Sequence, residues 1–70
     1  MDLNLKKDII KEINKKSAVI VYDFPYVLLK NEEESLRSLV DNAPTAYSME
    51  IKESPCSPGG FLILLERLES

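Results

Sequence analysis

Residues 46–68, AYSMEIKESPCSPGGFLILLERL, decide the fold, because they contain two strand patterns separated by a turn. Apolar and polar side chains alternate over residues 46–53, which is typical of a half-exposed strand at the edge of a sheet. Residues 54–60 are serine, proline, glycine and one cysteine, a composition that indicates a turn. Residues 61–68 are almost continuously apolar, so this stretch predicts a β-hairpin whose second strand is largely buried.

The second strand of this hairpin is apolar on both of its sides. Alternate side chains of a strand point to opposite faces of the sheet. One side therefore carries Phe61, Ile63 and Leu65, and the other carries Leu62, Leu64 and Leu68. Both faces of the sheet must be covered if these side chains are all to be buried.

Upstream, residues 18–22 form an unbroken β-favouring run that predicts a strand buried on both faces. Asp23-Phe24-Pro25 interrupts the run, since proline has no amide hydrogen for a sheet, and residues 26–29 resume in extended form. Residues 18–29 could be one long strand with a bulge or two short strands. We favour the single strand, because Asp-Phe-Pro is a poor hairpin turn.

Two segments have the periodicity of helices. Residues 3–16 predict an amphipathic helix with its apolar side chains in one half of the helical wheel, at Leu3, Leu5, Ile9, Ile10 and Ile13. Asn31 and the three glutamates that follow it predict the start of a second helix, with Asn31 as the N-cap and Glu34 at the capping-box position. This helix should end near Asn42, before Pro44.

These elements predict one α+β domain over residues 1–70, in the order helix, strand, helix, strand, strand. The expected architecture is a two-layer sandwich with both helices on one face of a three- to four-stranded mixed sheet. The order of elements resembles the latter part of the small sulfur-carrier domains whose first helix opens with Cys-Pro-x-Pro. Here that helix opens with Asp2-Leu3-Asn4-Leu5 and no strand is predicted before it, so the resemblance concerns the fold and not the carrier chemistry.

Composition excludes several kinds of site. The chain has no histidine and one cysteine, Cys56, so neither an internal disulfide nor a tetrahedral zinc site is possible, and no calcium-binding loop is present. No pair of residues is marked as a catalytic acid and base. We therefore expect a protein that is not an enzyme and that uses no cofactor or metal. The polar start of the chain and the single thiol favour a cytoplasmic protein without membrane segments.

Two helices can cover only one face of the sheet, and this mismatch predicts binding to another protein chain. The main hypothesis is a protein-binding or regulatory module that self-associates, most simply as a dimer, or binds another protein. The candidate interface comprises Phe61, Leu62, Ile63, Leu64, Leu65, Leu68, Tyr22, Phe24 and Tyr26.

Two alternatives remain. The net charge of −3 argues against general nucleic-acid binding, but residues 1–16 carry five lysines and three carboxylates, giving +2, whereas the remainder has four basic and nine acidic side chains, giving −5. Nucleic acid could bind to Lys7, Lys11 and Lys15 and stack on Tyr22, Phe24 and Tyr26. The other alternative is thiol or sulfur-carrier chemistry at Cys56, although no neighbouring base or cation in the sequence would activate it.

Overall fold

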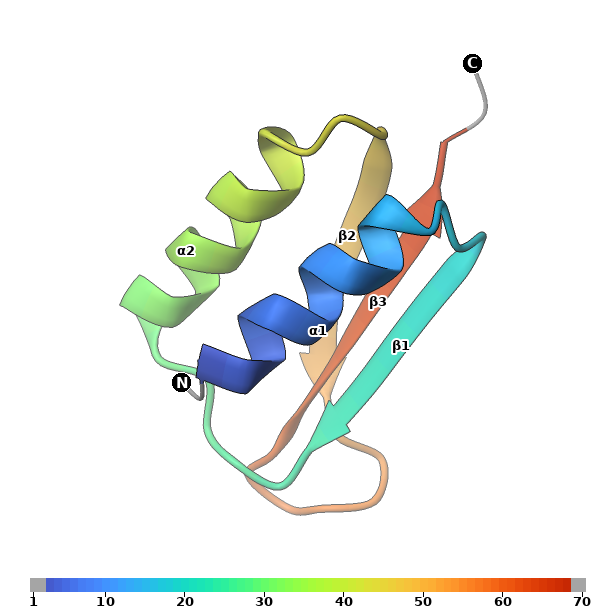
Figure 1. Cartoon of the computed structure of the whole chain (residues 1–70). Helices are drawn as coiled ribbons and strands as arrows, with labels where there is room; N and C mark the ends of the chain where they lie inside the picture. The colour runs from blue at the N-terminus through green and yellow to red at the C-terminus, as the bar shows by residue number, and fades with distance from the viewer. Residues whose placement is uncertain (1–2, 69–70) are drawn as a thin grey trace.

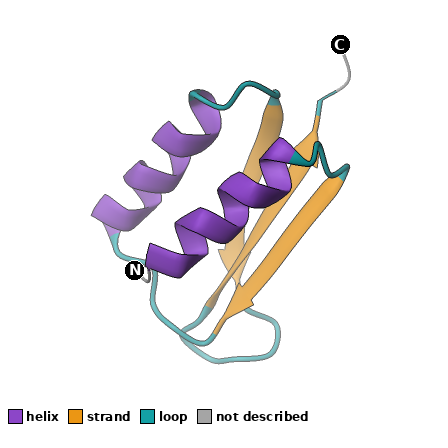
Figure 2. Cartoon of the chain, viewed as in Figure 1, coloured by secondary structure: helices purple, strands orange, loops and turns teal. Residues whose placement is uncertain are grey.

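The computed structural model describes residues 3–68, which form a layer of two helices packed on a layer of three strands (Figures 1 and 2). The chain is therefore α+β, as predicted. In chain order the elements are α1 (Leu3–Asn14), β1 (Val19–Phe24), α2 (Lys30–Asp41), β2 (Tyr47–Glu53) and β3 (Phe61–Arg67). Both helices lie on the same side of the sheet (Figure 1).

The sheet has the strand order β1-β3-β2, and β3 is antiparallel to both of its neighbours. The prediction of a mixed sheet was wrong because β1 and β2, which are parallel to each other, are separated by β3. No fourth strand occurs within residues 3–68. The preference for one long strand over residues 18–29 was also wrong. The strand ends at Phe24, which pairs with Phe61 at the start of β3, so no partner residue remains beyond it.

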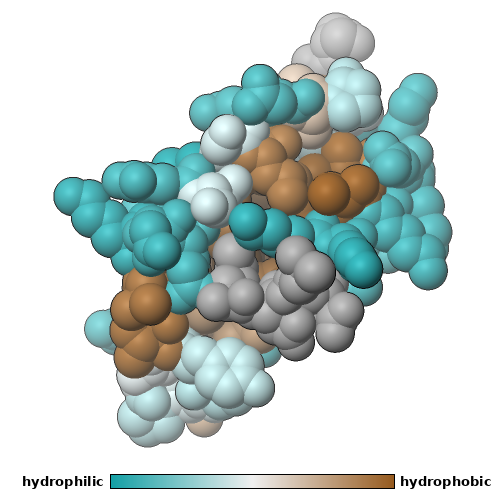
Figure 3. Space-filling model, turned by 60° about the vertical axis from the view of Figure 1, so that its left-hand side comes forward, coloured by the Kyte–Doolittle hydropathy of each residue, from teal (hydrophilic) through white to brown (hydrophobic). Residues whose placement is uncertain are grey.

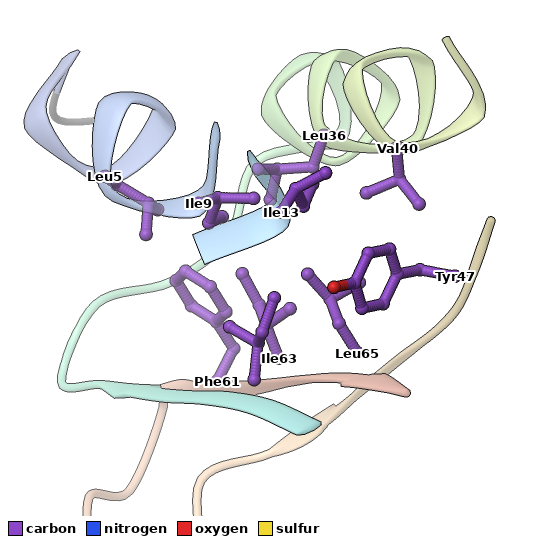
Figure 4. Close-up of a cluster of buried hydrophobic side chains, with 10 residues drawn as sticks. Leu5, Ile9, Ile13, Leu36, Val40, Tyr47, Phe61, Ile63 and Leu65 are labelled. Carbon is purple, nitrogen blue, oxygen red and sulfur yellow. The ribbon is translucent and has the colours of Figure 1, made fainter. Parts of the chain in front are cut away.

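The core lies between the two layers, where apolar side chains of the helices and the sheet point toward one another (Figure 4). Its buried members are Leu5, Ile9, Ile13, Ile20, Leu36, Val40, Tyr47, Phe61, Ile63 and Leu65. Ile10 was predicted on the buried side of α1, but 44% of its surface is exposed. The four-residue spacing of Leu5, Ile9 and Ile13 places one narrow stripe on the sheet, and Ile10 lies beside that stripe.

The turn between α1 and β1 is held by side chains from β2 and β3. Lys16 has a φ of 58°, a left-handed conformation that ends the helix. The Tyr47 hydroxyl donates to the Ser17 carbonyl at 2.6 Å, and an Arg67 guanidinium nitrogen donates to the Lys16 carbonyl at 2.5 Å. These contacts attach the turn before β1 to the end of the sheet where β2 begins and β3 ends.

The second helix begins two residues earlier than predicted. Its N-cap is Leu29, which has extended backbone angles and no side-chain acceptor, while Asn31 lies inside the first turn. A Glu32 carboxylate oxygen accepts the amide hydrogen of Leu29 at 3.3 Å, which is one half of a capping box. The side chain of Asn31 was predicted to cap the helix, but no side chain at the N-cap accepts a backbone amide in the structure.

The β2–β3 loop brings Gly60 against the end of β1. The Gly60 amide donates to the Ser57 carbonyl at 3.0 Å, and a Cβ at Gly60 would collide with the carbonyl oxygen of Phe24. Gly59 has a φ of 79°, which favours glycine. The two glycines therefore serve the turn and the close approach of β1, as hairpin chemistry predicts.

Candidate protein interface

The side of the sheet that faces away from the helices carries four neighbouring apolar side chains. We call Val19, Val21, Leu62 and Leu64 the back-face patch. The strand register places Val21 directly beside Leu64 and Val19 in the next row of the same face. Val19 and Val21 are 57% and 53% exposed, whereas Leu62 and Leu64 are half-buried. No described helix or loop is interposed on this side of the sheet, since both helices pack on the other (Figure 1).

Charged and polar residues border the back-face patch. On β2 the same face carries Ser48, Glu50 and Lys52, and the Lys52 ammonium lies 3.4 Å from a Glu50 carboxylate oxygen. Asp23 and Glu66 lie at opposite ends of the patch. The border therefore holds three carboxylates and one ammonium group, and the apolar area is restricted to β1 and β3.

The predicted interface residues of β3 separate into two groups. Phe61, Ile63 and Leu65 are buried beneath the helices, so they are unavailable to a partner and belong to the core. Leu62 and Leu64 belong to the back-face patch. Leu68 follows β3 directly and is 53% exposed.

The three predicted aromatic residues do not form one platform. Tyr22 and Phe24 lie on the helix side of β1, where their rings stack with centroids 5.9 Å apart, and the Phe24 ring stacks on Phe61 at 5.0 Å. Both are half-buried against the core. Tyr26 lies in the loop after β1 and is 65% exposed.

The environment of Tyr22 is apolar and acidic. Burial raises the pKa of the Tyr22 hydroxyl above its usual value of 10.0, and the carboxylates of Asp8 and Glu12 on α1 raise this pKa further. Glu12 also accepts a hydrogen bond of 2.7 Å from the Ser17 hydroxyl.

Sequence reasoning missed Val19 and Val21, the most exposed members of the back-face patch. It took residues 18–22 for a strand buried on both faces, which is typical of a central strand. In the structure β1 is at an edge of the sheet and is covered on one face only. The sequence did contain a signal for this exposure. Two helices leave one face of the whole sheet uncovered, and this applies to residues 18–22 as well as to residues 61–68.

The predicted polyanion contacts lie along one side of the first helix and the turn after it. Lys7 and Lys11 are on α1, and Lys15 follows its last residue; all three are exposed. The Lys15 ammonium is 3.8 Å from a Glu12 carboxylate oxygen, and Asp8 adjoins Lys7 in the sequence. The positive charge of this surface is thus partly offset by carboxylates.

Cys56 is an exposed thiol in the loop between β2 and β3. The loop is organised by Ser54, whose hydroxyl accepts the backbone amides of Cys56 and Ser57 at 3.2 and 3.0 Å and donates to an Asp23 carboxylate oxygen at 2.5 Å. These bonds shape the turn without directing a base toward the sulfur. Among residues 3–68 no group of three or more Cys, Asp or Glu side chains is arranged to hold a metal ion.

A small depression lies between α2 and β2. Its volume is about 110 Å³, and it is lined by Arg37, Val40, Asp41, Tyr47 and Met49. Arg37 is turned toward Glu33, with a nitrogen–oxygen distance of 3.8 Å. Seen from the side of α2, hydrophilic side chains cover most of the surface and apolar ones lie in separate areas (Figure 3).

Comparison with known proteins adds no assignment: no protein-family model matches the chain, and no curated protein or solved structure is significantly similar to it. None of the helices in the described part of the chain is long and apolar enough to span a membrane.

Proposed function

We propose that this chain is a small, non-enzymatic protein-binding module that self-associates, and that the back-face patch is the contact between two copies. The observation that supports the proposal is the set of apolar side chains on the side of the sheet without helices. Val19 and Val21 are both more than half exposed, although β-branched side chains of a sheet are normally covered.

The size of the patch implies a weak association. Fully burying one valine or leucine side chain stabilises a protein by about 1.5–3 kcal/mol relative to leaving it exposed. Four such residues, two of them already half-buried, provide much less area than the roughly 800 Å² per partner of a standard interface. A transient dimer suits a regulatory module, because modest changes in concentration then change its population.

Electrostatics predict how salt affects the dimer. Two copies facing each other would bring together two borders in which carboxylates outnumber ammonium groups. The resulting repulsion is screened by salt, because exposed charges beyond about 8–10 Å interact little at physiological ionic strength. Self-association should therefore become stronger, not weaker, as salt is added.

Sedimentation velocity over a series of concentrations tests this proposal. The double substitution Val19→Thr/Val21→Thr keeps β-branched residues on an exposed strand and replaces apolar methyl groups by hydroxyls, so the monomer should remain folded. We expect the dimer to dissociate about tenfold more readily, or more, because both copies lose two apolar contacts.

Ser48→Thr is the matched control, since Ser48 lies on the same face of the sheet but on β2, outside the patch. It should leave the association unchanged. A chain that stays monomeric at every concentration, or a dimer that tolerates the Val19/Val21 double substitution, would refute the proposal.

A further inference from the structure

The outer edge of β1 carries a row of backbone groups that the sheet does not use. The Arg67 amide donates to the Ala18 carbonyl at 2.9 Å, which makes Ala18 and Arg67 a hydrogen-bonded pair of the antiparallel ladder. Such pairs recur at every second residue. The even-numbered residues of β1 therefore bond to β3, and the amides and carbonyls of Val19, Val21 and Asp23 point away from the sheet.

Apart from the single charge of Asp23, this edge lacks the features that usually protect an edge strand. Between Val19 and Phe24 there is no lysine, no proline and no bulge, and the register with β3 is unbroken. Pro25 ends the run, so the usable edge is six residues long. The opposite edge differs, because β2 carries Lys52 and Glu53 at its end.

Carboxylates lie beside both faces of the β1 edge. Glu12 accepts a hydrogen bond of 2.7 Å from Ser17, two residues before β1, and Asp8 lies one turn before Glu12 on the same face of α1. Both carboxylates also raise the pKa of the Tyr22 hydroxyl on the helix side of β1. Asp23 and Glu66 lie on the other face. Glu12 is 3.8 Å from Lys15, but Asp8 forms no ion pair with any residue in the described part of the chain. A strand that adds to this edge therefore meets apolar side chains and negative charge.

We propose that the outer edge of β1 binds an extended segment of another protein, as an antiparallel fourth strand in which apolar and basic residues alternate. Directly opposed residues of antiparallel strands share a face. The apolar residues of the segment lie beside Val19 and Val21, and the basic residues lie on the helix side near Asp8. This surface adjoins the dimer contact, because the side chains of Val19 and Val21 belong to both, but it uses the backbone edge of β1 and does not depend on self-association.

A second copy of this chain fits the β1 edge poorly. Pairing β1 with β1 of another copy would place the two α1 helices on the same side of the joined sheet, since α1 lies on the helix side of its own sheet and is joined to β1 by a short turn. Helices pack about 8–10 Å apart, whereas neighbouring strands are about 4.8 Å apart. The same arrangement would bring the Asp8 and Glu12 carboxylates of both copies together. A segment without a helix avoids both conflicts.

The test uses a blocked heptapeptide of alternating lysine and valine and the ¹⁵N-labelled chain with Cys56→Ser. Binding should shift the amide signals of Val19, Val21 and Asp23, slow the hydrogen exchange of those amides, and weaken as salt is added. In the proposed arrangement the valine amides of the peptide face β1 and the lysine amides face solvent. Methylating the valine amides should therefore weaken binding at least about tenfold, whereas methylating the lysine amides should not.

A pair of charge variants tests the helix side. Asp8→Asn should weaken binding of the peptide about two- to fivefold, the range expected for one exposed charge pair. Glu34 is an exposed carboxylate on α2, so Glu34→Gln should leave binding unchanged. Shifts confined to other residues, equal binding of both methylated peptides, or no binding at low salt would overturn the proposal. Protection of the Val19, Val21 and Asp23 amides on concentrating the chain alone would also overturn it, by showing that a second copy occupies the edge.

Discussion

At the scale of single residues, Tyr22 shows how a polar group is placed at the margin of the core. Its ring is half-buried between α1 and β1 and stacks on Phe24, and its hydroxyl lies near two carboxylates. The sequence pattern placed Tyr22 correctly on the same face as Ile20. Its acidic surroundings depend on Asp8 and Glu12 of α1, which lie fourteen and ten residues earlier in the chain, and no local pattern indicates how that helix is oriented on the sheet.

Tyr22 should make folding sensitive to alkaline pH. Its pKa is raised in the folded chain, so between its ordinary value of about 10 and the folded value the unfolded chain loses a proton that the folded chain keeps. The free energy of unfolding should therefore fall as the pH rises through this range and level off above the folded pKa. Tyr22→Phe should reduce that fall, as measured by urea unfolding at a series of pH values.

Tyr26→Phe is the control, because Tyr26 lies in an exposed loop. It should leave the pH dependence as in the parent chain. If the Tyr22→Phe and parent curves run parallel through the alkaline range, Tyr22 is not the group responsible.

At the scale of elements, the start of α2 is a place where the local sequence pattern and the structure differ. Asn31 followed by glutamates resembles a helix start, yet the helix extends two residues further toward the N-terminus and is capped by Leu29. The composition predicted the element and its charge distribution but not its first residue. The position of a helix end depends on where the preceding strand stops, and β1 stops where its partner strand begins.

A substitution at residue 29 should change the free energy of unfolding, whereas a substitution at residue 31 should change it very little. Leu29→Ser places a hydroxyl at an extended N-cap position and should raise the free energy of unfolding by about 0.5–1 kcal/mol. Leu29 is 57% exposed, so little apolar burial is lost. Asn31→Ala should change stability very little, whereas replacing an asparagine that caps a helix by alanine costs about 1 kcal/mol. Thermal or urea unfolding of the two variants measures both effects, and the reverse ranking would contradict the observed N-cap.

The strand patterns show the same limit. Alternation in residues 46–53 and 61–65 correctly predicted which side chains share a face of the sheet, because the two-residue period is a property of any strand, but not which face the helices cover. The apolar run in β1 did not show whether it was central or at an edge. That distinction arises from the strand order β1-β3-β2, which joins residues far apart in the chain. The predicted interface consequently included Leu62 and Leu64 of the back-face patch and several side chains of the helix-facing side, but not Val19 and Val21.

At the scale of the whole molecule, a chain of 70 residues has little stability to spare, since small domains bury a low fraction of their surface. Its two helices cover one face of the sheet, and no disulfide is available to compensate. In the proposed dimer, contact between copies would add stability as well as serve a function. Because this dimer would form only from folded chains, mass action would link its population to the folding equilibrium.

This linkage makes the thermal midpoint depend on protein concentration. The midpoint of the parent chain should rise by a few degrees between dilute and concentrated samples, because about 1 kcal/mol moves the midpoint of a domain of this size by about 4–8 °C. Val19→Thr/Val21→Thr should abolish the dependence, and added salt should increase it in the parent chain only. Differential scanning calorimetry provides the measurement. A midpoint that is independent of concentration in the parent chain, at low and at high salt, would mean that the uncovered face of the sheet does not contribute to folding through a second copy.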